Sequence, residues 1–308
     1  MIAQPHAAST RYSRVSSLTV FAPAKINLFL AITGRRADGF HDLLSVVAPL
    51  RWGDQLEIET RPGGVYSLSC DNADVPLDET NLILRAAGLF AAAAKPARGA
   101  HFHLRKVIPM GAGLGGGSSD GVAALVGLNR LAGEPLSLPE LSGMAARLGS
   151  DCPLFLHGRV CVMGGRGERV EPLTGPVLAR LSGRRLLVFK PDVSINTGWA
   201  YRQLVSAAPG SYLPAAQAEE RLSAWIASQQ PAEKLLFNNM EPAAFAKYLA
   251  LPTLLDALRQ QFGLTVGMSG SGSACFALLS GDEDAQAVIR FIRDSWGLQT
   301  FVVETETS

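Results

Sequence analysis

The sequence predicts an α+β protein of two domains. Its 308 residues fit about two domains of ordinary size. A strand, a glycine-rich loop and a helix follow one another between residues 100 and 131, and near the C-terminus the expected order is helix, strand, strand, helix, strand. The latter order favours an antiparallel sheet with helices on one face. Pro172, Gly175 and Pro176 interrupt the pattern, so we expect a flexible extension at 1–17 and domains at 18–178 and 179–308.

The composition excludes two classes of partner. The chain carries 28 Lys+Arg and 27 Asp+Glu, a net charge of +1, so no excess of positive charge attracts a nucleic acid. With 47% hydrophobic and 18% charged residues, the chain is expected to fold. Its most apolar run, Ala86 to Ala94, is far shorter than the roughly 18 residues needed to cross a bilayer, so no membrane partner is expected.

The cysteines and the N-terminal segment bear on location. Cys70, Cys152, Cys161 and Cys275 form no C-x-x-C pair and have no histidine at metal-ligand spacing, which favours reduced thiols in a cytoplasmic protein. The first residues contain two arginines and several serines but no acid, as transit peptides do. They lack the apolar core of a secretory signal.

The first elements are expected between residues 18 and 108. The apolar segment Leu18 to Thr33 is broken by Pro23, which predicts two strands around a bend, with Lys25 and Asn27 on one face of the second strand. Gly34, Asp38 and Gly39 mark a loop. The pattern then predicts a strand at Asp54–Thr60, a helix at Asn81–Ala94 and a strand at Ala100–Ile108.

The glycine-rich loop leads into a helix at Ser118–Leu131 that ends before Gly133. Ser137 and Glu140 form a capping-box pattern, and the helix that they open is expected to end at Gly149, which places Asp151 in a sharp turn. The first half closes with a strand at Cys161–Met163 and a turn at Gly164–Gly167.

The second half opens with a strand at Arg185–Lys190, followed by several helices. Its last part has the following expected elements: helix Pro252–Phe262, a strand, turn Ser269–Gly272, strand Ala274–Leu279, helix Asp282–Trp296 and strand Gln299–Val303.

The strongest functional signal is the segment PMGAGLGGGSSD at residues 109–120. So many glycines favour positive φ or a close approach of the backbone to a ligand. Because the loop directly precedes a helix, its N–H groups and the positive end of the helix dipole point toward one place. The segment therefore predicts a phosphate site rather than a plain flexible turn.

Three phosphate-binding motifs compete for this loop. A Walker A loop would need Lys after its second conserved glycine, and none follows here. Gly111, Gly113 and Gly116 match the dinucleotide pattern G-x-G-x-x-G, but Glu134 lies in a helix-exit turn instead of at the strand end where a ribose-binding acid belongs. A protein kinase would require H-R-D and D-F-G downstream, and both are missing.

Two charged residues could serve phosphoryl transfer. Lys25 lies on an apolar strand, so its ammonium must reach either water or an anion. Taken alone, Asp151 is better explained as a turn residue or a helix N-cap, the commoner role for Ser-Asp before Pro. Together with a phosphate loop, the two residues supply a possible base and a charge stabiliser for transfer to a hydroxyl.

Two further motifs remain open or fit a structural role. The turn Ser269–Ser273 could be a simple hairpin, or its exposed N–H groups could cover a substrate or phosphate. His101 and His103 share one face of a strand but have no third ligand nearby, which favours a surface position over a metal site.

Three segments in this order resemble the GHMP kinase superfamily: PAKINLFL at 23–30, PMGAGLGGGSSD at 109–120 and SGSGSA at 269–274. The resemblance implies an N-terminal ribosomal-S5-like α/β domain, a C-terminal ferredoxin-like α/β sandwich and an active site in the cleft between them. Segments 32–43 and 149–153 resemble the members that phosphorylate the 2-hydroxyl of a cytidine-diphosphate-linked methylerythritol in the non-mevalonate isoprenoid pathway. ATP and Mg²⁺ are the implied cofactors, with no metal ligands assigned. The expected assembly is a monomer or weak homodimer.

The resemblance also implies roles for single residues. The family's catalytic residues fall on Lys25 and Asp151, Asp151 taking the proton of the attacking hydroxyl and Lys25 keeping Asp151 ionised. Tyr201 is expected to stack on cytosine. The positions that match the ATP loop are Pro109, Met110, Gly111, Ala112, Gly113, Leu114, Gly115, Gly116, Gly117, Ser118 and Ser119. Those that match the substrate-binding positions are Asn27, Phe40, His41, Thr197 and Tyr201.

The sequence departs from the family pattern at a few positions. Phe40 stands where Tyr is frequent, which would remove one hydrogen bond worth about 1 kcal/mol. Arg166 occupies a glycine-rich turn near the cleft, and the segment before Leu18 has no family counterpart. One alternative is a kinase of the same fold that acts on another acceptor, such as homoserine or mevalonate. Alternatives from other functional classes are a nucleotide-binding module without catalytic activity and a dinucleotide-dependent oxidoreductase.

Overall fold

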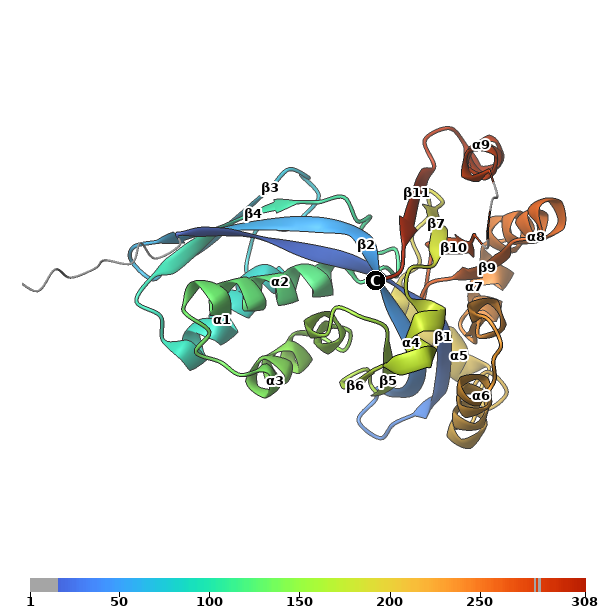
Figure 1. The fold of residues 1–308 in the computed structure, drawn as a ribbon, viewed down its shortest axis with the longest axis horizontal. Coiled ribbons are helices and arrows are strands. Elements are labelled where there is room, and N and C mark those ends of the chain that lie inside the picture. Colours follow the sequence, from blue (N-terminus) through green and yellow to red (C-terminus); the bar gives the residue numbers. More distant parts are fainter. Residues whose placement is uncertain (1–15, 280, 282–283) are drawn as a thin grey trace, which may run out of the picture.

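The computed structural model describes residues 16–279, 281 and 284–308. The start of the predicted extension at 1–15 and the predicted helix start at Asp282 therefore lie outside the described residues. Two sheets with flanking helices make up the chain, one in each half (Figure 1). Among the described residues, no helix is both long and apolar enough to span a membrane.

The first sheet is built on two long antiparallel strands, β1 and β2. Its order is β3-β4-β2-β1-β8, and β5 pairs with both β2 and β6. The strands of this sheet are β1 (Ser17–Arg35), β2 (His41–Arg61), β3 (Tyr66–Cys70), β4 (Gly99–Arg105), β5 (Cys161–Gly165), β6 (Arg169–Pro172) and β8 (Phe237–Asn238).

The predicted break at Pro23 is wrong, because β1 runs through it as a single strand. The pairing of β1 with β2 shifts between Pro23 and Lys25, so the irregularity is a bulge and not a bend between two strands. Pro23 lies opposite Gly53, where a Cβ atom would stand 2.2 Å from the carbonyl oxygen of Ala22. The missing side chain of Gly53 therefore allows the two strands to stay paired beside the proline.

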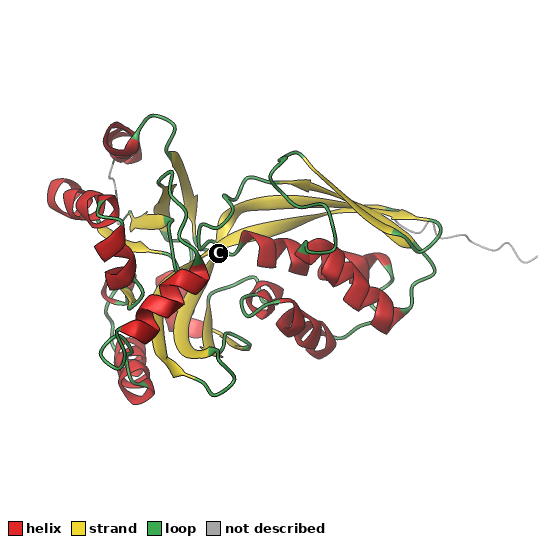
Figure 2. Cartoon of the chain, turned by 180° about the vertical axis from the view of Figure 1, so that it is seen from behind, coloured by secondary structure: helices red, strands yellow, loops and turns green. Residues whose placement is uncertain are grey.

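The helices of the first half lie on one side of this sheet (Figures 1 and 2). They are α1 (Leu82–Ala94), α2 (Gly116–Leu131) and α3 (Leu138–Leu148), followed by the 3-10 helix η1 (Cys152–Leu156). The predicted capping box is confirmed, since the Glu140 carboxylate accepts from the backbone N–H of Ser137 at 2.8 Å. Asp151 is the N-cap residue of η1, which confirms the predicted turn.

Other elements of the first half also differ from expectation, including β6, which follows the predicted turn at Gly164–Gly167. The segment 41–53 is the first part of β2, and β3 is a strand that the sequence pattern did not indicate. The interrupted segment near residue 175 contains a helix, α4 (Gly175–Leu181), whose start includes Pro176. The domain limits at 18–178 and 179–308 stay a prediction.

The second sheet has the order β11-β7-β10-β9 and is antiparallel throughout. This confirms the predicted antiparallel sheet, and β7 agrees with its predicted bounds, whereas β11 begins later than expected. The elements are β7 (Arg185–Lys190), α5 (Thr197–Ser206), α6 (Ala215–Ala227), η2 (Ala232–Lys234), α7 (Glu241–Lys247), α8 (Ala250–Phe262), β9 (Thr265–Met268), β10 (Cys275–Leu278), α9 (Ala285–Trp296) and β11 (Phe301–Glu306).

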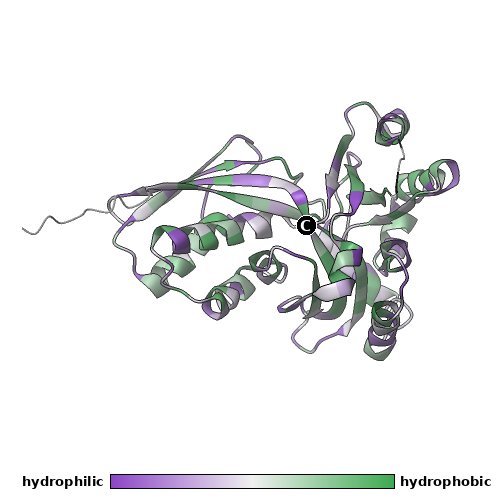
Figure 3. Cartoon of the chain, viewed as in Figure 1, coloured by the Kyte–Doolittle hydropathy of each residue, from purple (hydrophilic) through white to green (hydrophobic). Residues whose placement is uncertain are grey.

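The two halves share an apolar core. One buried cluster combines Ile26 of β1 and Leu50 of β2 with Val188 of β7 and Phe276 of β10. Figure 3 shows apolar residues along the parts of β1 and β2 that approach the second sheet. Strand β8 comes from the second half yet pairs with β1 of the first. This joint core fixes the two halves against each other, and the candidate site lies at their junction.

Candidate active site

The predicted phosphate loop lies between β4 and α2. Gly111, Gly113 and Gly115 have positive φ values of 62°, 77° and 72°, a backbone region that favours glycine. Gly115 is the N-cap of α2 and has no side chain to satisfy the first N–H groups of the helix. These groups and the helix dipole therefore remain available to an anion. A cavity of about 390 Å³ is lined by residues 109–118, with Lys106 and Asp120 at its wall.

The other two predicted motifs meet this loop. The backbone N–H of Lys25 donates to the carbonyl of Leu114 at 2.9 Å, and the Ser269 hydroxyl donates to the carbonyl of Gly113 at 3.0 Å. A Cβ atom on Gly113 would stand 2.3 Å from the carbonyl oxygen of Ser269. The turn at 269–273 is therefore packed against the phosphate loop and does more than join two strands.

Lys25 and Asp151 form an ion pair at the centre of the site. The Lys25 Nζ atom lies 3.5 Å from Asp151 Oδ2, although β1 and the turn before η1 are far apart in the chain. The Lys25 side chain is 5% exposed and that of Asp151 is 40% exposed. An ammonium held inside the protein thus faces a carboxylate that solvent or a substrate can reach. This arrangement suits a base whose charge a neighbouring cation stabilises.

Asn27 sets the position of the Lys25 ammonium. Its Oδ1 atom accepts a hydrogen bond from Lys25 Nζ at 2.7 Å, which agrees with the predicted shared face of β1. The Asn27 amide nitrogen donates to the Ser45 hydroxyl at 2.9 Å, and that hydroxyl donates to the Phe29 carbonyl at 2.6 Å. Ser45 escaped the sequence analysis because it lies in the part of β2 that the pattern did not indicate.

Four of the five candidate substrate residues line a second cavity, of about 700 Å³, that reaches Asp151; Asn27 is not among its lining residues and contacts Lys25 instead. Phe40, His41, Thr197 and Tyr201 contribute to its wall, so the structure brings them together with the catalytic pair. The Thr197 hydroxyl lies 3.0 Å from that of Ser271, which joins this wall to the turn at 269–273. The sequence analysis missed several other lining residues, among them the polar or charged Arg35, Ser150 and Arg202.

Aromatic and cationic groups meet in this cavity. The rings of His41 and Tyr201 are 4.7 Å apart between centroids, and the Arg166 guanidinium lies 4.6 Å from the centroid of the Phe40 ring. Burial lowers the pKa of His41, with a smaller contribution from Arg35, so the imidazole is neutral near pH 7. Burial also raises the pKa of Tyr201 to about 12, and the Asp151 charge adds to this shift. His41 Nε2 is buried and has no hydrogen-bond partner among the described residues.

His101 and His103 lie away from this site. Their rings contact the Ser67 and Ser69 hydroxyls, His101 with both and His103 with Ser69. In the described part of the chain, no group of three or more His, Cys, Asp or Glu side chains is arranged to hold a metal ion.

Family models match both halves of the chain. The model described as "GHMP kinases N terminal domain" matches residues 81–159, which include the phosphate loop. The model described as "GHMP kinases C terminal" matches residues 222–298, which include the turn at 269–273.

Two curated relatives carry the same name, 4-diphosphocytidyl-2-C-methyl-D-erythritol kinase. The protein of Synechococcus sp. (strain CC9311) is 39% identical over 298 residues, covering 93% of this chain and 94% of its own. That of Deinococcus radiodurans is 39% identical over 269 residues, covering 87% and 86%.

Solved structures agree with the fold. The crystal structure of 4-(cytidine 5'-diphospho)-2C-methyl-D-erythritol kinase matches with a TM-score of 0.75 and 34% identity, over 94% of this chain and all of that one. The mevalonate kinase of Methanococcus jannaschii has a TM-score of 0.73 at 12% identity, over 96% and 99%, and shows the fold alone. From its sequence relatives, its fold and its paired domain matches, the chain belongs to the 4-diphosphocytidyl-2-C-methyl-D-erythritol kinase family of the GHMP kinases.

Proposed function

We propose that this kinase transfers the γ-phosphoryl group of ATP to the 2-hydroxyl of 4-diphosphocytidyl-2-C-methyl-D-erythritol, a step of the non-mevalonate isoprenoid pathway. One observation carries the proposal. Lys25 contacts the phosphate loop through Leu114, and its ammonium pairs with Asp151, which lines the large cavity. The catalytic pair thus joins the place expected for ATP to the place expected for the acceptor.

The proposed reaction is a direct in-line transfer. The Asp151 carboxylate accepts the proton of the attacking hydroxyl, and Lys25 offsets negative charge on that carboxylate and on the transferring group. The N–H groups at the start of α2 and in residues 113–119 hold the β-phosphate. Because Lys25 is buried and held by Asn27, its charge is in place before the substrates bind.

The large cavity supports the proposed acceptor. Arg35, Arg166 and Arg202 line it and supply positive charge for a diphosphate. His41 Nε2 has no partner in the described part of the chain, so near neutral pH it can exchange a hydrogen bond with a polar base or hydroxyl. In the present structure the Tyr201 ring lies against His41, so the proposed stacking of Tyr201 on cytosine uses the remaining face or edge of that ring.

Mg²⁺ is the proposed companion of ATP. This ion is commonly held by substrate phosphates with one or two carboxylates, and it neutralises charge on the phosphates. The residues at the phosphate cavity fit a nucleotide, since free helix N–H groups converge there.

The site is complete within one chain. The catalytic pair, the phosphate loop and the acceptor cavity are all formed by residues of one chain, which fits the proposed monomer or weak homodimer. The proposed location is the cytoplasm, where the four free cysteines would stay reduced. Sedimentation of the active enzyme across a range of concentrations tests this assembly, and a tight oligomer at the lowest concentration contradicts it.

The decisive test is coupled ADP release from Mg-ATP by the purified protein. The acceptors to compare are 4-diphosphocytidyl-2-C-methyl-D-erythritol, homoserine and mevalonate, with a no-acceptor control for ATP hydrolysis. We expect turnover with the cytidylated acceptor alone. Turnover with homoserine or mevalonate instead would leave the kinase assignment intact and overturn the proposed acceptor.

A further inference from the structure

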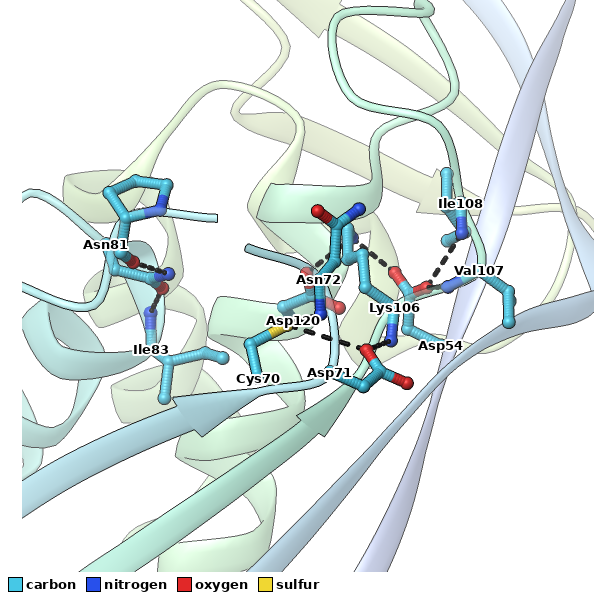
Figure 4. Close-up of polar contacts among 11 residues, drawn as sticks. Asp54, Cys70, Asp71, Asn72, Asn81, Ile83, Lys106, Val107, Ile108 and Asp120 are labelled. Carbon is cyan, nitrogen blue, oxygen red and sulfur yellow. Dashed lines mark hydrogen bonds and ion pairs between the residues drawn. The ribbon is translucent and has the colours of Figure 1, made fainter. Parts of the chain in front are cut away.

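A buried charge cluster lies beneath the phosphate loop, outside the catalytic pair. The Lys106 ammonium contacts the carboxylates of both Asp54 and Asp120, the latter at 2.7 Å (Figure 4). The side chains of Lys106, Asp54 and Asp120 are 5%, 0% and 5% exposed. Salt bridges so deeply buried are weak evidence for stability, because two carboxylates and an ammonium all lose their water. The cluster therefore calls for a role beyond stability.

The cluster connects the two ends of the phosphate loop. At the start of the loop, Asp54 Oδ1 accepts from the backbone N–H groups of Val107 and Ile108, at 2.6 and 2.8 Å. At its end, Asp120 belongs to α2, the helix that the loop opens. Lys106 bridges the two carboxylates (Figure 4). The entry and the exit of the loop are thereby tied to one ammonium.

The loop also packs directly against this ammonium. A Cβ atom added to Gly116, the first residue of α2, would stand 2.9 Å from Lys106 Nζ. The backbone N–H of Lys106 is held by Asp71 Oδ1 at 2.9 Å, so the base of its side chain is fixed as well. Lys106 and Asp120 line the 390 Å³ cavity together with the loop, and the buried Asp120 Oδ1 atom has no hydrogen-bond partner among the described residues.

We propose that Lys106, held by Asp54 and Asp120, is a positioning residue that fixes the two ends of the phosphate loop at the spacing required by the phosphates of ATP. The proposal rests on the role of the loop in ATP binding. With the ends fixed, the N–H groups of the loop and of α2 converge before ATP arrives, so binding does not have to order them. Lys106 acts through the backbone and has no part in proton transfer.

Substitution of Lys106 by methionine tests this role, with ATP binding measured by calorimetry in the absence of acceptor. We expect Lys106→Met to weaken ATP binding about tenfold or more and to raise the KM for ATP, with the KM for the acceptor nearly unchanged. The matched control is Lys95→Met, the same change at an exposed position after α1, which should behave like the unsubstituted enzyme. An unchanged ATP affinity in a folded Lys106→Met protein would overturn the proposal, as would equal losses for ATP and acceptor.

Asp120→Asn keeps the test decisive if Lys106→Met does not fold. The Lys106 ammonium donates to Asp120 Oδ2 at 2.7 Å, and Asn at this position keeps the shape of the side chain without its charge. Because the proposal needs this carboxylate to hold Lys106, Asp120→Asn should weaken ATP binding in the same direction as Lys106→Met and leave the KM for the acceptor nearly unchanged. An unchanged ATP affinity in a folded Asp120→Asn protein contradicts the proposal. Because the binding measurements need no acceptor, a wrong acceptor assignment leaves them intact.

Discussion

The Lys25 ammonium lies 3.5 Å from the Asp151 carboxylate, and the two side chains differ sharply in exposure. The buried lysine is held by Asn27, whereas the aspartate faces the acceptor cavity. This difference in exposure matches the different roles proposed for the two residues. A carboxylate that must meet a hydroxyl has to be accessible, and the cation that stabilises it acts more strongly where water is excluded.

Replacing either residue of this pair should remove chemistry while sparing ATP binding. We expect Lys25→Ala and Asp151→Ala to lower kcat by about 10²-fold or more, because the base or its stabilising charge is lost, with little change in the KM for ATP. The double variant should be little worse than either single one, since the two residues act as a unit. Asp74→Asn, at an exposed position, is the control. Near-normal turnover of either single variant would refute the proposed mechanism.

Alanine substitutions at Gly111 and Gly113 should lower the unfolding free energy by different amounts, because only Gly113 packs against the turn at 269–273. Both have positive φ, but a Cβ on Gly113 would meet Ser269, whereas a Cβ on Gly111 would have no atom within 4 Å. Gly111→Ala should therefore cost about 1 kcal/mol of unfolding free energy, from the backbone conformation alone. Gly113→Ala should cost at least about 1 kcal/mol more and weaken ATP binding, because the turn at 269–273 must move. Denaturant unfolding measures both, and equal losses would contradict the packing of this turn on the loop.

Sequence patterns predicted the fold and most of the residues that the structure brings together at the candidate site, for identifiable reasons. The loop glycines carry a local requirement for positive φ, and the second sheet follows from the order of its elements. The cluster of Lys106, Asp54 and Asp120 has no local pattern. Asp54 lies in β2, Lys106 directly follows β4, and Asp120 lies in α2. Only the pairing of β2 with β4 and the packing of α2 bring the three together.

The errors in predicting β1 and β2 have the same cause: contacts between separate strands leave no local pattern in the sequence. Considered alone, the sequence of β1 predicts a break at Pro23. Its partner Gly53 accommodates the proline, and this pairing cannot be inferred before the register of β1 and β2 is known. Ser45 lies in a segment buried across several successive residues, so it lacks the alternation typical of a half-buried strand. Its role in holding Asn27 depends on the same register.

Asp120 should make the stability of the protein fall as pH rises toward neutrality. Burial raises its pKa from 3.8 to about 7, Lys106 opposing and Asp54 adding to this shift. Between these two values the folded state holds more protons than the unfolded chain, so the free energy of unfolding decreases with rising pH and levels off above about 7. Asp120→Asn should remove this slope. Denaturant unfolding at several pH values measures it, and parallel curves for the two proteins would contradict the assignment.

Arg166 should contribute to acceptor binding through charge. Its guanidinium lies over the Phe40 ring and faces the cavity, so it can approach a diphosphate while the ring holds it in place. Arg166→Ala should raise the KM for the cytidylated acceptor about tenfold, the loss of roughly one charge-assisted hydrogen bond, and leave the KM for ATP nearly unchanged.

The dependence of the KM for the cytidylated acceptor on ionic strength shows whether Arg166 acts through its charge or through its packing on Phe40. If Arg166 pairs with the diphosphate, raising the ionic strength should weaken acceptor binding in the unsubstituted enzyme more than in Arg166→Ala, because the variant has lost one screened interaction. Arg166→Lys should recover part of the affinity, since it restores the charge without the planar fork of the guanidinium. Arg130→Ala, at an exposed position in the last turn of α2, controls for the general loss of positive charge. Equal salt slopes for Arg166→Ala and the unsubstituted enzyme would show that Arg166 serves only to pack on Phe40, and the diphosphate would then have to be bound by Arg35 and Arg202.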